Sequence, residues 1–140
     1  MAGDVLSTEQ ILEILPYRYP MLLIDRMWFD GDDKVFGLKN LTVNEEVFLG
    51  HFPGHPIFPG VLQVEMMVQL SSIAVRDKLD PSGEKDIYMK SLKNVKFRKP
   101  ANPGDRLLAE STLTSFENGE AAFTCTIKTN QGLACQAQMV

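Results

Sequence analysis

Residues 61–80 form the longest stretch of the chain without glycine or proline. Its apolar residues lie on all sides of a helical turn, at positions 61, 62, 64, 66, 67, 68, 70, 73, 74 and 75. This pattern predicts a helix that is buried rather than one that lies on a surface, and Pro81-Ser82-Gly83 marks its end. The rest of the chain must therefore fold around this helix.

The remaining chain predicts mainly strands. Runs of apolar and β-branched residues bounded by turn residues indicate strands at 21–29, 34–43, 87–97, 106–116, 120–129 and 132–140. Asn118-Gly119 is a strong hairpin signal, and Ser7 with Gln10 predicts a capping box at the start of a short helix. We expect one α+β domain over residues 1–140, in which an antiparallel sheet covers the helix. Because one curved sheet covers only part of a helix, we also expect a dimer.

The polar residues of the predicted helix lie on one face. Glu65, Gln69, Ser72 and Arg76 are spaced by four, three and four residues. A polar seam at an interface would give the same pattern. Glu65, however, has apolar neighbours in the chain, and a carboxylic acid in such a setting is suited to proton donation. Gln69, one turn further along, is placed to hydrogen-bond to Glu65.

The segment GHFPGHPIFPG at 50–60 contains both histidines of the chain and leads directly into this helix. His51 and His55 have the spacing of two zinc ligands on a helix, but Pro53, Gly54 and Pro56 exclude that helix, so we expect no metal site. A structural corner remains an alternative. The helix start favours an active site, because Gly60 leaves its backbone N–H open to a ligand carbonyl. A histidine base, a free N–H and an acid together suit proton abstraction beside a carbonyl.

Charge and composition narrow the partners. The net charge of −4 argues against non-specific nucleic-acid binding. No apolar run is long enough to cross a bilayer, and the first residues lack a signal-peptide pattern. We therefore expect a cytoplasmic protein without nucleic-acid or membrane partners. Cys125 and Cys135 are too few for a disulfide framework, so we expect both to be reduced.

Basic residues gather in one part of this acidic chain. They are Lys93, Lys96, Arg98, Lys99 and Arg106. A solvated strand and loop would explain them. The alternative is a docking patch for an acidic partner.

Three sequence blocks resemble one family. LPYRYPMLLIDR (15–26), GHFPGHPIFPGVLQVEMMVQ (50–69) and VKFRKPANPGD (95–105) are similar to the (3R)-hydroxyacyl-[acyl-carrier-protein] dehydratases of type II fatty-acid synthesis, the FabZ type. The resemblance implies a hot-dog fold, in which an antiparallel sheet wraps around one long central helix. It also implies a dimer, commonly a trimer of dimers, with active sites shared between two subunits.

The resemblance further implies roles for individual residues. His51 removes a proton from C2, the Gly60 N–H binds the thioester carbonyl, and Glu65 of the partner subunit protonates the departing 3-hydroxyl. Gln69 supports Glu65, and no metal or organic cofactor is required. The carrier protein of such systems is acidic and would dock on the basic residues. The acyl tunnel is expected to be lined by Leu22, Phe58, Met66 and Met67.

Some positions differ from the family pattern. Tyr17 stands where a histidine is usual, while Gln63 and Met66 replace an aliphatic and a small residue.

Three alternative functions remain open: a hot-dog acyl thioesterase, a dehydratase of a specialised polyketide or aryl-polyene pathway, and a non-catalytic acyl-binding module.

Overall fold

Six antiparallel strands form one sheet in the order β1-β2-β4-β5-β6-β3. The structure is a computed structural model, and it describes residues 4–140. The strands are β1 (Arg26–Asp30), β2 (Lys34–Asn40), β3 (Leu92–Phe97), β4 (Arg106–Glu117), β5 (Glu120–Thr129) and β6 (Gly132–Met139). Asn118 and Gly119 both have positive φ, as a two-residue hairpin turn requires, and they join β4 to β5 as predicted.

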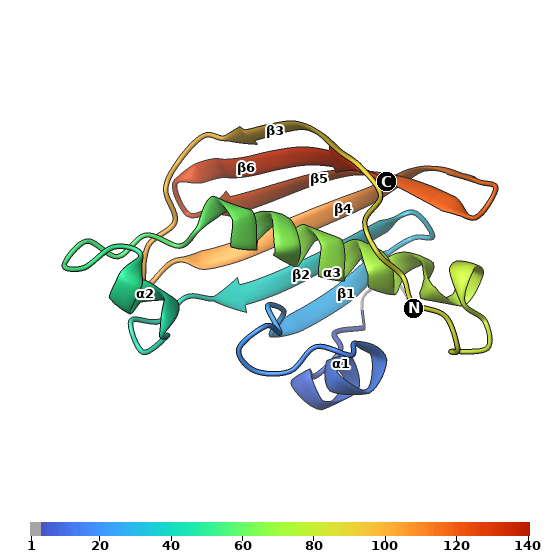
Figure 1. Cartoon of the computed structure of the whole chain (residues 1–140), viewed down its shortest axis with the longest axis horizontal. Coiled ribbons are helices and arrows are strands. Elements are labelled where there is room, and N and C mark those ends of the chain that lie inside the picture. The colour runs from blue at the N-terminus through green and yellow to red at the C-terminus, as the bar shows by residue number, and fades with distance from the viewer. Residues whose placement is uncertain (1–3) are drawn as a thin grey trace.

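The long helix α3 (Gly60–Leu79) runs across one face of this sheet (Figure 1). Its bounds differ by one residue at each end from the predicted 61–80. All positions from 62 to 76 are buried or half-buried, so the prediction of a buried helix is confirmed. The helix lies so close to β2 that a side chain at Gly37 would collide with Leu70 of α3.

Two short helices precede α3. The helix α1 (Thr8–Ile14) begins with the predicted capping box: Gln10 N–H donates to Ser7 Oγ and Ser7 N–H donates to Gln10 Oε1. The helix α2 (Val47–Gly50) was not expected. It is a single turn whose sequence has no strong capping signal, and it leads the chain into the histidine-rich loop.

The predicted strand at 21–29 is wrong over residues 21–25, and β1 begins only at Arg26. The backbone of this segment does not pair with a neighbouring strand at Met21 and Leu23. The Met21 carbonyl and the Leu23 N–H bond instead to the side chain of Gln69 on α3. The predicted strands at 34–43 and 87–97 are likewise shorter, ending at Asn40 and beginning at Leu92.

Side chains of α3 and of the inner sheet face share one core. Cys125 on β5 and Cys135 on β6 are free thiols buried in it, as expected. A long helix held against a single antiparallel sheet is the hot-dog fold.

Candidate active site

Backbone hydrogen bonds hold the loop that carries the two histidines. Phe52 and His55 exchange bonds, N–H to carbonyl, of 2.9 and 2.8 Å, which closes a tight turn. The Ile57 N–H donates to the His51 carbonyl at 2.9 Å. The side chain of His55 is exposed, so its contribution is through the backbone. No cluster of three potential metal ligands occurs within residues 4–140.

The His51 ring is fixed in one tautomer. Its Nδ1 lies 2.7 Å from the carbonyl oxygen of Ile57. A carbonyl oxygen only accepts, so Nδ1 carries a proton, and in the neutral ring the lone pair lies on Nε2. This is the tautomer in which Nε2 can serve as a general base.

A cavity of about 350 Å³ brings His51 together with the start of α3. Gly60 and Val61 line it, and both belong to the first helical turn, whose N–H groups have no acceptor inside the helix. The remaining lining residues are Ile57, Phe58, Pro59, Gln63, Phe97, Arg98, Lys99 and Pro100. The structure thus joins the predicted base to the predicted carbonyl-binding N–H.

An aromatic ring explains why position 60 is glycine. A Cβ atom at Gly60 would lie 2.6 and 2.7 Å from Cε1 and Cδ1 of Phe97, closer than carbon atoms approach. Phe97 ends β3, and its side chain is 56% exposed. Sequence patterns do not predict this contact, because the two residues lie in segments far apart in the chain.

Glu65 and Gln69 are joined as their spacing predicted. Gln69 Nε2 donates to Glu65 Oε1 at 3.1 Å and to the Met21 carbonyl at 2.7 Å. Gln69 Oε1 accepts from the Leu23 N–H at 3.1 Å. Gln69 is fully buried and Glu65 is half-buried. The amide is therefore fixed by backbone groups and in turn orients the carboxylate.

Tyr17 belongs to the same surroundings. Burial raises the pKa of its phenol, the Glu65 carboxylate adds to the rise, and Arg76 opposes it. Arg76 pairs with Asp80 rather than with Glu65, and its Nη1 lies 3.8 Å from Asp80 Oδ2. The predicted polar face thus divides into a glutamate–glutamine pair and an arginine–aspartate pair.

Glu65 does not line the cavity of His51. It follows Gly60 by five positions, which places it about 140° from Gly60 around the helix axis. Within one chain, the predicted acid is therefore not part of the cavity that holds the predicted base.

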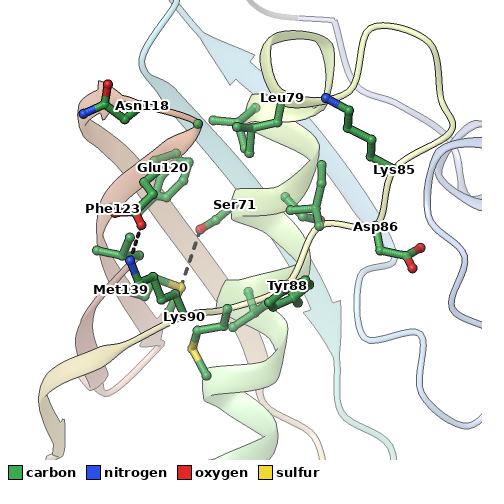
Figure 2. Close-up of a pocket in the computed structure, with 18 residues that line it drawn as sticks. Ser71, Leu79, Lys85, Asp86, Tyr88, Lys90, Asn118, Glu120, Phe123 and Met139 are labelled. Atoms are coloured by element: carbon green, nitrogen blue, oxygen red, sulfur yellow. Dashed lines mark hydrogen bonds and ion pairs between the residues drawn. The ribbon is translucent and has the colours of Figure 1, made fainter.

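A larger cavity of about 610 Å³ lies at the other end of α3. Figure 2 shows Ser71 and Leu79 of the helix on one side of it, Asn118 and Glu120 of the hairpin on another, and Tyr88 on the segment before β3. Lys90 and Glu120 form an ion pair across it. His51, Gly60 and Glu65 do not line this cavity, so its size does not make it the site of the chemistry.

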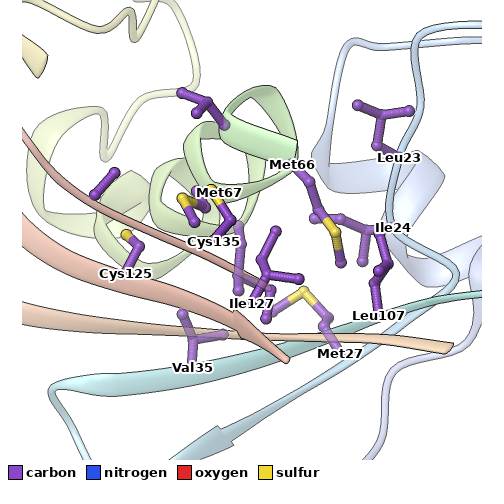
Figure 3. Packing of buried hydrophobic residues seen from close by; sticks show 14 of the residues in the cluster. Leu23, Ile24, Met27, Val35, Met66, Met67, Leu107, Cys125, Ile127 and Cys135 are labelled. Carbon is purple, nitrogen blue, oxygen red and sulfur yellow. The ribbon is translucent and has the colours of Figure 1, made fainter. Parts of the chain in front are cut away.

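The four residues expected to line an acyl tunnel occupy different surroundings. Met66 and Met67 are fully buried and face the sheet within the core (Figure 3). Phe58 is 2% exposed and lines the His51 cavity, whereas Leu22 is half-buried. Neither methionine lines either of the two cavities.

Four of the five basic residues lie together. Lys93 and Lys96 are exposed on β3, and Arg98 and Lys99 follow at the rim of the His51 cavity. Their side chains are partly engaged, since Arg98 bonds to Gln136 and Lys99 to the Gln131 carbonyl. Arg106 begins β4, which β5 and β6 separate from β3.

A family model described as a FabA-like domain matches residues 15–138, which include the loop, α3 and the basic segment. The chain belongs to this family. Curated relatives of this FabA-like chain include the 3-hydroxyacyl-[acyl-carrier-protein] dehydratase FabZ of Wolbachia sp. subsp. Drosophila simulans, 41% identical over 132 residues that make up 94% of this chain and 92% of the relative. The enzyme of the same name from Geobacter metallireducens is 42% identical over 137 residues, 96% of this chain and 91% of the relative. The resemblance found in the sequence is confirmed.

Solved structures confirm the fold of this FabA-like chain. The dehydratase heterocomplex ApeI:P from Xenorhabdus doucetiae matches with a TM-score of 0.74 at 16% identity, covering 92% of this chain and 87% of that one. A thioesterase from Haemophilus influenzae matches with a TM-score of 0.70 at 15% identity, covering 96% and 87%. At these identities the matches show the hot-dog fold alone. Within residues 4–140, none of the helices has the length and apolar character needed to cross a membrane.

Proposed function

We propose that this FabA-like protein removes water from a (3R)-3-hydroxyacyl group on an acyl carrier protein and releases the trans-2-enoyl thioester in fatty-acid biosynthesis. The observation that carries the proposal is His51, held with a free Nε2 beside the first turn of α3. The FabZ dehydratases that resemble the chain over more than nine-tenths of its length support it.

The reaction divides among three groups. His51 Nε2 takes a proton from C2 of the substrate, while the Gly60 N–H donates to the thioester oxygen on which negative charge develops. The C3–O bond breaks as Glu65 delivers a proton to the departing hydroxyl, which leaves as water. The histidinium then loses its proton and the carboxylate regains one, which restores both groups for the next turnover. Neither a metal nor an organic cofactor takes part.

Gln69 serves as a positioning residue for Glu65. Its Nε2 holds one carboxylate oxygen at 3.1 Å, and its own position is set by Met21 and Leu23. The other carboxylate oxygen is left to carry the proton that the substrate receives.

Glu65 reaches the substrate from a second copy of the chain. The proposal is supported by the position of Glu65, which does not line the His51 cavity of its own chain. It is also supported by apolar side chains that the single chain leaves uncovered, with Val61 71% exposed and Leu92 on the edge strand 38% exposed. The assembly we propose is a homodimer with two shared sites. Three such dimers form a trimer of dimers.

The acidic carrier docks on the basic residues of β3 and the loop that follows. Arg98 and Lys99 lie at the rim of the His51 cavity, where a carrier-bound chain would enter. Lys96→Glu, at an exposed position outside the cavity, should raise KM for carrier-bound substrate and leave KM for a pantetheine thioester unchanged. Lys128→Glu, at an exposed position of β5, is the matched control.

The test of the reaction follows enoyl formation and free thiol release together, with a 3-hydroxyacyl carrier protein as substrate. Enoyl product without thiol supports dehydration. Thiol without enoyl product would instead identify a thioesterase, and neither signal would favour an acyl-binding module. His51→Ala and Glu65→Gln should each lower turnover at least ~10²-fold, whereas His55→Ala, in the same loop, should stay near wild type.

Mixed dimers test the shared site. A His51→Ala chain paired with a Glu65→Gln chain leaves one site with both groups intact if each site draws on two chains. Random mixing of the two inactive variants should therefore restore about a quarter of wild-type turnover. If both residues served a site within one chain, mixing would restore nothing.

A further inference from the structure

Gln63 is a buried polar residue that lines the His51 cavity and has an unpaired acceptor atom. It lies on α3 and is 3% exposed. Its Oε1 is buried, and within residues 4–140 no protein group donates to it. The residue lines the cavity together with His51 and Gly60.

An unpaired buried amide oxygen is costly, because it loses its bonds to water without replacing them. Reversing the amide assignment would put an N–H at the same buried place, so the deficit does not depend on that assignment. An aliphatic side chain would fill the position without this cost. A polar group kept here is therefore explained by a ligand that bonds to it.

The position of Gln63 defines which part of the substrate it meets. It follows Gly60 by three residues, so the two lie on one side of α3, about 5–6 Å apart between Cβ positions. Exposure falls from 71% at Val61 to 3% at Gln63, while Arg98 and Lys99 are exposed at the rim. A thioester carbonyl held at Gly60 thus directs its carrier arm towards the rim and its acyl carbons towards Gln63.

We propose that Gln63 Oε1 accepts a hydrogen bond from the 3-hydroxyl of the substrate. The proposal rests on the dehydratase function above and names a further residue that contacts the substrate. The hydroxyl is the polar group of the acyl part closest to the carbonyl. It donates its own hydrogen to Gln63, and its oxygen receives the proton of Glu65 as the C3–O bond breaks. The departing water keeps both hydrogens.

This contact distinguishes the 3-hydroxyacyl substrate from the enoyl product, which has no hydroxyl. Binding is measured in a His51→Ala background, which prevents turnover, with 3-hydroxyhexanoyl-pantetheine and trans-2-hexenoyl-pantetheine as probes. Adding Gln63→Met should weaken binding of the hydroxy compound about tenfold, the scale of one hydrogen bond. Binding of the enoyl compound should change less than about twofold, because it never made that bond.

Two further variants complete the experiment. Gln63→Glu keeps an acceptor oxygen and should retain the preference for the hydroxy compound. Leu70→Met, on the same helix but packed against Gly37, should leave both affinities unchanged. The melting temperature of Gln63→Met should equal or exceed that of the parent, because an unpaired polar group is removed.

An equal loss for both compounds, or no loss for either, would overturn the role of Gln63. The carrier-protein assay on the wild-type protein separates this outcome from failure of the proposed function. Enoyl formation by the wild type together with an unchanged preference in Gln63→Met rejects the hydroxyl contact alone. Absence of enoyl formation by the wild type rejects both.

Discussion

Replacing Gln69 by leucine should lower the free energy of unfolding by about 3 kcal/mol. The amide is fully buried and makes three bonds, to the Leu23 N–H, the Met21 carbonyl and Glu65. Leu23 is 4% exposed, so its unpaired N–H would cost about 1–3 kcal/mol. Met21 is 43% exposed, and water offsets part of the loss at its carbonyl, which leaves about 1 kcal/mol there. Glu65 is half-buried and regains solvent, so it adds little.

Urea unfolding at equal protein concentration measures this difference. For a chain of this length the same loss should lower the melting temperature by roughly 10 °C. Ser72→Ala is the control on the same helix. The Ser72 hydroxyl donates to the Gln69 carbonyl at 2.8 Å, and its removal leaves no buried group unpaired. It should change stability by less than about 1 kcal/mol. A Gln69→Leu protein within about 1 kcal/mol of wild type would refute the reasoning, because the segment at 21–23 would then be held by something other than this amide.

Three other substitutions or treatments test separate contacts. Gly60→Ala should lower the free energy of unfolding by about 1–2 kcal/mol, because its Cβ collides with Phe97. Adding Phe97→Ala should recover most of this loss in urea unfolding. An equal loss in the double variant would contradict the contact. Burial raises the pKa of Cys135 to about 11, so its thiol stays protonated at pH 8. It should therefore react with iodoacetamide far more slowly in the native protein than in urea, as mass spectrometry would measure. Equal rates would show an exposed thiolate. Ser7→Ala removes the cap of α1 and should cost about 1 kcal/mol by thermal unfolding, while Ser7→Asp should not.

Local patterns predicted much of the fold. The helix α3, the Asn118-Gly119 turn and the capping box each depend on neighbours in the chain, and each was predicted, α3 to within one residue at each end. The strand predicted at 21–29 was wrong over residues 21–25, because the apolar residues there pack in the core while Gln69, far along the chain, bonds to their backbone. An apolar run indicates burial but does not say which groups satisfy the backbone.

The candidate site, too, was predicted from the sequence only in part. The Glu65–Gln69 bond follows from four-residue spacing and was predicted. The Phe97 ring over Gly60 and the unpaired amide of Gln63 were not, because each depends on how β3 and its loop pack against the start of α3. Gln63 carried a signal in the sequence nonetheless, as a polar residue between the apolar Leu62 and Val64.

The place of α3 in the chain affects how the protein is made. Three of the strands that cover the helix, β4, β5 and β6, follow it in the sequence. On the ribosome, the apolar helix therefore emerges well before most of its cover, and only β1 and β2 are available to shield it. Until residues 106–139 are synthesised, the nascent chain exposes the surface that later forms its core, which makes this interval the one in which a chaperone would bind.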